Sequence, residues 1–262
     1  MYKLPLIILS IIISSFFSKN ITAQTVTINT TADFIEVDNQ GNIYAVNDYN
    51  LKKYNANGKL LFKYSDRING NISSIDVTNP LRILVFFKES NVIVFLDWQL
   101  LPIADPVNIF ENTNSEAEAV AVSSAGNFWM YSEDCGCATL YNDRWEKIQQ
   151  TENLSDRITG NKIIFIRENN QKLYIGLPDR VLTFDIFGYY LTTVHFKNAS
   201  NIKFTGDYIS YVKNNNLSIF NLQTKQETTV KLLTEPYRKI FFKDNKIYYL
   251  SDEKIIIEKI KN

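Results

Sequence analysis

Short apolar runs alternate with turn residues along most of the chain. The stretch DNQGNIYAVNDYNLKKYNANGKL (38–60) shows the pattern, because turns rich in Asp, Asn and Gly precede each of its apolar runs. β-Branched and aromatic residues dominate the runs, and such side chains suit a pleated, half-buried surface. Asn, Asp and Gly tolerate the backbone dihedrals of tight turns. The pattern therefore predicts short antiparallel strands joined by tight turns.

These runs recur at a nearly constant period. A marker strand follows a turn in six units, at 42–47, 82–88, 127–133, 172–177, 208–213 and 246–251. The starts of these markers lie 40, 45, 45, 36 and 38 residues apart. Propeller blades built from four strands repeat at about this period.

Each unit has the same internal order of strands. A first strand precedes the marker, at 34–38, 72–77, 119–123, 162–167, 201–205 and 239–243. A third strand follows it, at 51–55, 92–97, 139–143, 181–185, 217–221 and 255–260. A fourth strand closes the first five units, at 60–65, 100–105, 145–150, 190–196 and 228–233. We expect no helix of consequence, and we interpret the polar stretch 111–119 as a loop.

The sixth unit shows only three strands, and a spare strand, 25–31, precedes the first unit. We expect the spare strand to complete the last blade, since closure of a ring protects sheet edges from aggregation. The predicted fold is all-β: a six-bladed β-propeller with four-stranded antiparallel blades, closed by the strand nearest the N-terminus. A twisted β-sandwich or an open array is the alternative.

The N-terminus has the pattern of a secretory signal peptide. Lys3 precedes the apolar stretch 4–17, and a more polar stretch leads to Ala23, where we expect cleavage. The domain prediction is a signal peptide over 1–23 and a single propeller over 24–262. An uncleaved anchor is the alternative. No Cys near Ala23 offers a lipid attachment point, and no later run is long enough to span a membrane. We therefore expect a periplasmic or secreted protein.

The net charge of the chain excludes few classes of partner, but it argues against a nucleic-acid partner. The chain has 28 basic and 28 acidic residues, and loss of residues 1–23 would remove Lys3 and Lys19 and no acid. No long run of one sign is present, whereas a nucleic-acid partner would need a basic face. We predict neither a nucleic-acid partner nor binding to an anionic membrane.

Two stretches resemble known propeller groups. Residues 37–60 resemble the NHL-type propeller repeat, with Val-Asp, a turn, Gly-Asn-Ile-Tyr, a second turn, a basic and aromatic strand, and Asn-Gly-Lys. Residues 75–97 resemble an uncharacterised group of exported propeller-like proteins of the Bacteroidetes. The resemblance implies a propeller fold and an exported location. It implies no catalytic residues, because neither group has a shared reaction.

The residues for several common reactions are missing from the sequence. The single histidine, His195, lies in a predicted outermost strand, so it can supply neither a multi-histidine zinc site nor a credible Ser–His–Asp triad. The sequence has no Gly-x-Ser-x-Gly elbow and no phosphate-binding loop. We therefore predict no catalytic residue, no metal and no cofactor.

Carboxylates at predicted strand ends support an alternative. These are Asp38, Asp48, Asp76, Glu133, Asp134 and Asp207. Around a central channel, such oxygens would suit calcium and a lactonase-like hydrolase. The favoured interpretation is that aspartates at turn starts cap their own backbone amides.

Both cysteines lie in one short stretch, EDCGCA (133–138). An exported protein favours a local disulfide between Cys135 and Cys137. A redox-active dithiol and a metal clip are the alternatives. Glu133 and Asp134 would raise the thiol pKa and slow exchange, and further metal ligands are lacking nearby.

Aromatic residues allow two interpretations. Trp98, Trp129, Trp145 and fifteen tyrosines are of the kind enriched at recognition sites, although packing between blades is the favoured role. We predict a non-enzymatic exported binding or scaffold module whose loop-lined faces bind an envelope protein, a peptide or a glycan. A calcium-assisted hydrolase in the channel is the alternative, and a thiol–disulfide factor is a third class.

Overall fold

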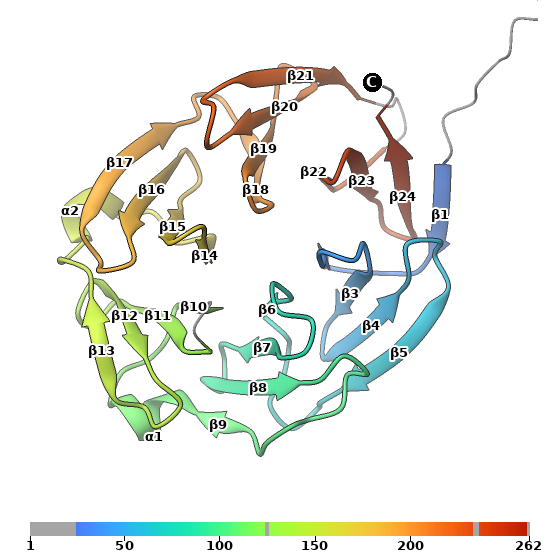
Figure 1. The fold of residues 1–262 in the computed structure, drawn as a ribbon. Coiled ribbons are helices and arrows are strands. Elements are labelled where there is room, and N and C mark those ends of the chain that lie inside the picture. Colours follow the sequence, from blue (N-terminus) through green and yellow to red (C-terminus); the bar gives the residue numbers. More distant parts are fainter. Residues whose placement is uncertain (1–24, 124–125, 233–235, 261–262) are drawn as a thin grey trace, which may run out of the picture.

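The computed structural model describes residues 25–123, 126–232 and 236–260. Within them, six four-stranded antiparallel sheets are arranged radially around a central axis (Figure 1). The strands of blades one to five run consecutively from the inner to the outer edge of each blade. The predicted fold class, an all-β six-bladed propeller, is confirmed.

The strands of the first three blades follow the order of the chain. Blade one contains β2 (Phe34–Val37), β3 (Ile43–Asn47), β4 (Asn50–Tyr54) and β5 (Leu60–Ser65). Blade two contains β6 (Ser74–Asp76), β7 (Ile83–Phe87), β8 (Val92–Leu96) and β9 (Val107–Asn108). Blade three contains β10 (Ala119–Val122), β11 (Phe128–Ser132), β12 (Cys137–Tyr141) and β13 (Lys147–Gln150).

The last three blades complete the ring. Blade four contains β14 (Phe165–Asn169), β15 (Lys172–Gly176), β16 (Arg180–Asp185) and β17 (Tyr190–His195). Blade five contains β18 (Ser200–Phe204), β19 (Tyr208–Lys213), β20 (Asn216–Asn221) and β21 (Glu227–Lys231). Blade six contains β22 (Lys239–Lys243), β23 (Lys246–Leu250), β24 (Lys254–Lys259) and β1 (Thr25–Asn29).

Strand β1 forms the outer edge of blade six by pairing with β24, from Thr25 opposite Glu258 to Asn29 opposite Lys254. Its side chains alternate as a half-buried strand requires. Ile28 is buried and Thr27 is exposed. Ile28 belongs to an apolar cluster that also contains Tyr54 of blade one. The first strand of the chain therefore joins its last blade to its first.

Apolar side chains pack between neighbouring blades. Each of the six core clusters is built mainly from two adjacent sheets. Middle strands such as β7 and β11 are therefore buried on both faces, which explains their nearly continuous apolar runs. Trp129 is fully buried in the cluster between blades three and four, and Trp98 stays 49% exposed.

The inner strands give the ring two different faces. We call the face where the inner strands begin the entry face, and the face where they end the exit face. Because the strands alternate in direction, the entry face carries the connections from one blade to the next. Two short helices lie in these connections: α1 (Ile109–Thr113) and α2 (Ser155–Ile158). The expectation of no helix is wrong for these two segments, and the Asn108 side chain caps α1 by accepting from the Glu111 amide.

The predicted fourth strand of blade two is wrong. Residues 100–105 form an irregular turn, and the fourth strand, β9, is only Val107–Asn108. The carboxylate of Asp97 accepts from the amides of Gln99 and Leu101, and Leu100 has a φ of 64°. This local capping turns the chain where the apolar letters alone suggested a strand.

The predicted signal peptide, 1–23, lies outside the described residues. In the part of the chain that the structure describes, no helix combines the length and apolar character needed to cross a membrane.

Candidate functional site

Two cavities occupy the central channel, one toward each face. The entry cavity, of about 350 Å³, is lined by the first residues of the inner strands, including Phe34, Ser74 and Lys239. The exit cavity, of about 380 Å³, is lined by the last residues of the same strands. Glu36 and Arg167 line both cavities. These two side chains therefore lie at the boundary between them.

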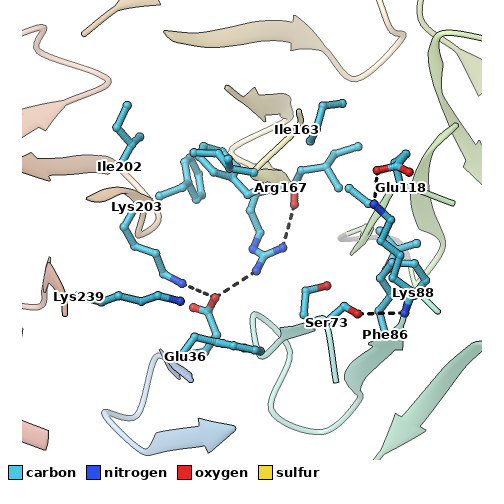
Figure 2. Close-up of a pocket in the computed structure, with 18 residues that line it drawn as sticks. Glu36, Ser73, Phe86, Lys88, Glu118, Ile163, Arg167, Ile202, Lys203 and Lys239 are labelled. Carbon is cyan, nitrogen blue, oxygen red and sulfur yellow. Dashed lines mark hydrogen bonds and ion pairs between the residues drawn. The ribbon is translucent and has the colours of Figure 1, made fainter. Parts of the chain in front are cut away.

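An ionic cluster forms this boundary, and we call it the waist (Figure 2). Glu36 on β2 accepts from the Lys203 ammonium group on β18 and lies 3.4 Å from Nη2 of Arg167 on β14. The Arg167 guanidinium also donates to the Ile75 carbonyl at 3.0 Å, and its Nη1 lies 3.9 Å from Asp76. The waist thus ties the inner strands of blades one, two, four and five together across the channel.

Strand geometry directs these charged side chains inward. On β2, Ile35 and Val37 are buried between blades, so Glu36 between them points to the channel. On β18, the register with β19 shifts between Ser200 and Lys203, which marks a bulge. Bulges re-aim side chains next to functional sites. Here Ile202 and Lys203, neighbours in sequence, both line the entry cavity.

Charge is distributed unevenly along the channel. Four cationic side chains and two carboxylates line the entry cavity, an excess of two positive charges: Lys88, Arg167, Lys203 and Lys239 against Glu36 and Glu118. Two cations and five carboxylates line the exit cavity, an excess of three negative charges: Arg167 and Lys243 against Glu36, Asp76, Glu168, Asp207 and Asp244. The entry side of the channel therefore favours anions.

Lys239 is the cation of the entry cavity that stands apart from the others. Lys203 and Lys88 pair with Glu36 and Glu118, whereas no described carboxylate lies within ion-pair distance of Lys239. Burial, followed by the nearby charges of Lys203 and Arg238, lowers the pKa of Lys239. An anion beside this ammonium group would offset both effects.

A third cavity, of about 500 Å³, adjoins the entry cavity near blades five and six. The two cavities share Phe34, Ile164, Ile202, Lys203 and Lys239. The third cavity is lined mainly by apolar side chains, and among the described residues its charged lining is formed by Lys203 and Lys239. The two ammonium groups therefore sit where a polar cavity meets an apolar one.

Two of the predicted strand-end carboxylates serve as turn caps. Asp38 is fully buried, and its Oδ1 accepts from the amides of Gln40 and Asn42, both at 2.9 Å. Its Oδ2 accepts from the Tyr44 hydroxyl at 3.1 Å. Asp76 accepts from the Thr78 amide at 2.9 Å. The interpretation of these two aspartates as caps is confirmed.

Three of the other four carboxylates lie on the opposite face, whereas Asp207 lines the exit cavity together with Asp76. Asp48, Glu133 and Asp134 are exposed on entry-face turns, whereas Asp38 and Asp76 lie at the exit ends of their strands. Asp207, also on the exit side, accepts from the side-chain amides of Asn169 and Asn170. Among the described residues, no three carboxylate, histidine or cysteine side chains are grouped in a way that could hold a metal ion.

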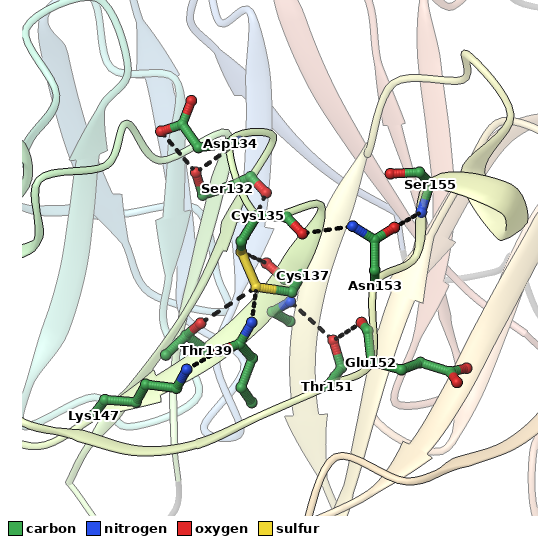
Figure 3. The surroundings of a disulfide bond; sticks show 12 residues. Ser132, Asp134, Cys135, Cys137, Thr139, Lys147, Thr151, Glu152, Asn153 and Ser155 are labelled. Carbon is green, nitrogen blue, oxygen red and sulfur yellow. Dashed lines mark hydrogen bonds between the residues drawn. A yellow bond between two sulfur atoms is a disulfide. The ribbon is translucent and has the colours of Figure 1, made fainter.

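Cys135 and Cys137 lie in the entry-face turn between β11 and β12, with their sulfur atoms bonded and their Cα atoms 5.2 Å apart (Figure 3). The turn rests on the segment before α2, because the Asn153 amide donates to the Cys135 carbonyl at 2.8 Å. A Cβ on Gly136 would lie 2.7 Å from Ser155 Oγ, and Gly136 has a φ of 59°. Oxidation of the pair in the purified protein stays a prediction.

His195 lies apart from the channel. It is the last residue of β17, the outer strand of blade four, and it is exposed. The candidate-site residues that the sequence interpretation missed are Glu36, Arg167, Lys203 and Lys239. The available signal was the presence of one or two charged residues in each of four short inner strands: FIEV, FIREN, SNIKF and KIFFK.

No family model and no curated protein sequence matches the chain. Solved structures do match in fold. Virginiamycin B lyase from Staphylococcus aureus is 12% identical, with a TM-score of 0.62 over 92% of this chain and 100% of that one. A catalytically inactive histidine-to-alanine variant of that lyase, solved with quinupristin, is 11% identical, with a TM-score of 0.58 over 91% of this chain and 100% of that one.

A third similar structure belongs to a different kind of protein. It is the extracellular domain of BT4673 from B. thetaiotaomicron, described as a hybrid two component system. The identity is 14%, and the TM-score is 0.54 over 86% of this chain and 33% of that one. The similar structures thus include both an enzyme and an extracellular domain. At these identities the likeness shows the propeller fold alone.

Proposed function

We propose that residues 24–262 form one exported propeller, periplasmic or secreted, that acts as a binding module without enzymatic activity. Its partner is a protein, peptide or glycan of the cell envelope, held on the entry face. The signal-peptide pattern of residues 1–23, the resemblance to NHL-type and exported Bacteroidetes propellers, and the likeness to an extracellular domain support the exported location.

The observation that carries this proposal is the make-up of the entry face. The connections 66–73, 109–118 and 151–164 are long, and they hold both helices. Ile68 is 95% exposed, Phe110 on α1 is 49% exposed and Ile164 is 46% exposed. A few apolar anchors of this kind carry most of the free energy in protein interfaces.

The alternative functions receive less support from the channel. A calcium-assisted hydrolase needs several free oxygen ligands, whereas Glu36, Asp38 and Asp76 are engaged in the ion pairs and hydrogen bonds described above. A histidine-to-alanine change is described as inactivating the similar lyase, but His195 here lies on an outer strand. The fold likeness to that lyase therefore does not bring its activity to this chain.

The test is recovery of partners from an envelope extract on immobilised residues 24–262, with identification by mass spectrometry. We expect the same partner in ordinary buffer and in about 0.5 M salt, since salt screens mainly exposed charges. Phe110→Ala should abolish recovery without changing the melting temperature. Phe187→Ala is the matched control, because Phe187 is 63% exposed on an exit-face turn.

Two results would overturn the proposal. One is a partner that is lost equally in both variants or in neither, since the entry face would then carry no specificity. The other is the absence of any reproducible partner together with calcium-dependent hydrolysis of a lactone or ester, which would establish the channel enzyme instead.

A further inference from the structure

We call the place where the entry cavity meets the third cavity the junction. It is charged on one side and apolar on the other. On one side, Lys203 and Lys239 extend toward Glu36, as Figure 2 shows. On the other side, the third cavity has apolar walls that include Ile35, Pro178 and Ile240. A ligand that fills both cavities would need a charged end and an apolar body.

The charge balance at this place indicates which charge the ligand's polar end should carry. Lys203 already neutralises Glu36. The Arg167 guanidinium lies 3.9 Å from the Asp76 carboxylate on its exit side and donates to the Ile75 carbonyl. Lys239 is then the one ammonium group lining the junction without an ion-pair partner among the described residues. A single negative charge would complete the site, whereas a second would lie close to the Glu36 carboxylate. A monoanion such as a carboxylate therefore fits better than a doubly charged phosphate.

The volume of the cavities indicates how large the ligand's apolar body can be. The entry and third cavities measure about 350 and 500 Å³ and share part of their walls. Cavities of roughly 300–1,000 Å³ are the usual size for small-molecule sites. A carboxylate on an apolar body of medium length has the dimensions to reach from Lys239 into the third cavity.

We propose that this junction binds an apolar carboxylate, with its anionic group at Lys239 and Lys203 and its apolar body in the third cavity. The carboxylate belongs either to a free organic acid or to the C-terminal residue of a peptide. This site goes beyond the proposed function, because its anion-binding groups are the channel side chains Lys203 and Lys239, although the loop residue Ile164 also lines both cavities.

The bulge in β18, the inner strand of blade five, lets two adjacent side chains of one strand line the site. Because two adjacent residues of this strand, Ile202 and Lys203, line the junction, one strand supplies both an apolar contact and a cation. Asn201, which the bulge places at a φ of 53°, also lines the third cavity. Asn readily adopts this left-handed conformation, so the local sequence fits the geometry.

The probe is octanoate, titrated into residues 24–262 by calorimetry, with octanamide as the uncharged analogue of the same shape. We expect saturable binding of octanoate and affinity at least about tenfold weaker for octanamide, as loss of one charge-assisted hydrogen bond implies. Lys239→Gln should weaken octanoate by about tenfold or more and remove the preference over octanamide. Lys231→Gln, on the exposed outer strand β21, should leave both unchanged.

A second variant tests the apolar half. Ala199 lines the third cavity, so Ala199→Phe should weaken octanoate while leaving butyrate, which is too short to reach far into that cavity, unaffected. Both variants are checked for an unchanged thermal transition, so that a folding defect is not read as lost binding.

An acetylated tripeptide ending in leucine, with a free or an amidated C-terminus, shows whether the bound carboxylate comes from a peptide or from a free acid. Binding only of the free-carboxylate peptide assigns the site to chain ends, and binding only of octanoate assigns it to free acids.

The proposal is overturned if no acid or peptide binds saturably at millimolar concentration. It is also overturned if folded Lys239→Gln binds octanoate as tightly as the parent protein. Neither result touches partner recovery from the envelope extract, which depends on Phe110. The two proposals can therefore fail separately.

Discussion

The carboxylate of Glu36 on β2 lies against the ammonium group of Lys203 on β18, 167 residues later in the chain. The Arg167 guanidinium approaches the same carboxylate from β14. The side chains of Glu36, Arg167 and Lys203 are only 15%, 13% and 25% exposed. Replacing a whole buried ion pair costs little, but removing one partner leaves uncompensated charges. The waist should therefore be sensitive to single changes.

Glu36→Gln should lower the free energy of unfolding by about 2–4 kcal/mol, because it leaves Lys203 and Arg167 unpaired in the channel. The measurement is urea denaturation followed by circular dichroism. Glu116→Gln, in an exposed loop, is the control and should change the value by less than about 0.5 kcal/mol. Adding Lys203→Met to Glu36→Gln should recover part of the loss. If the double variant is less stable than the additive sum of the two single variants, the pairing argument is wrong.

The contribution of β1 can be measured by removing it. Deletion of residues 24–32 should expose the outer edge of β24 and cost several kcal/mol, a large share of the roughly 5–15 kcal/mol that stabilises a domain. Ile28→Ala should cost about 2–4 kcal/mol, since Ile28 is buried between blades six and one. Thr27→Ala, on the exposed side of the same strand, should have almost no effect. A truncated protein that melts within a degree or two of the full chain would show that β1 does not stabilise the ring.

Alkaline pH should unfold the protein through its buried tyrosines. Burial, together with a nearby acid, raises the pKa values of Tyr44, Tyr64, Tyr211 and Tyr248 above the ordinary value of 10.0. The unfolded state then releases protons first, so stability is complete below about pH 10 and is lost as the pH rises further. Burial also lowers the pKa of Lys239 and Lys243. This burial destabilises the folded protein while the lysines are charged in the unfolded state, and the penalty is relieved as the pH rises to the unfolded lysine pKa of 10.5.

The measurement for this pH effect is absorbance at 295 nm, which reports tyrosine ionisation, beside near-ultraviolet circular dichroism. The ionisation of these four tyrosines should coincide with the loss of tertiary signal. Tyr44→Phe should also destabilise the protein at neutral pH by about 1–3 kcal/mol, because it removes the hydroxyl that donates to buried Asp38. Full tyrosine ionisation near pH 10 with an intact tertiary signal would contradict the argument.

Much of the fold could be predicted from the sequence because both faces of each blade are buried. A strand such as β7, ILVFF, is apolar at every position, so its position within the repeat is easy to recognise in the sequence. The fourth strands were harder, because their outer sides face solvent and their letters are mixed. In blade two, the caps at Asp97 and Asn108 decided the structure, and such side-chain caps compete locally with strand pairing.

The candidate site was harder to predict than the fold. Glu36, Arg167 and Lys203 are far apart in the chain, and each looks like an ordinary polar residue in a short strand. Their meeting depends on the ring bringing the inner strands around one channel, and for Lys203 on a bulge in β18. The turn aspartates drew attention because they precede recognisable turns, yet Asp38 and Asp76 are used for capping. The single-sequence pattern indicates turns well and cross-channel pairs poorly.

The turn at Cys135–Gly136–Cys137 supports the last prediction. We expect the two cysteines to be oxidised to each other in protein purified from the periplasm, with no free thiol after denaturing alkylation and mass spectrometry. Replacement of both by Ser should change stability by less than about 2 kcal/mol, because a loop this short restricts the unfolded chain very little.

Gly136→Ala should disturb the same turn more than loss of the disulfide does. Its Cβ would meet Ser155 Oγ at 2.7 Å and Asn153 Nδ2 at 2.9 Å, in a backbone conformation with a φ of 59°. A non-glycine side chain at such a strained position costs on the order of 1–3 kcal/mol. Differential denaturation of Gly136→Ala and of the double Ser variant makes the comparison. Two free thiols in the parent protein would contradict the pairing. A double Ser variant less stable than Gly136→Ala would show that the covalent link, and not the packing of Gly136 on the segment before α2, holds this turn in place.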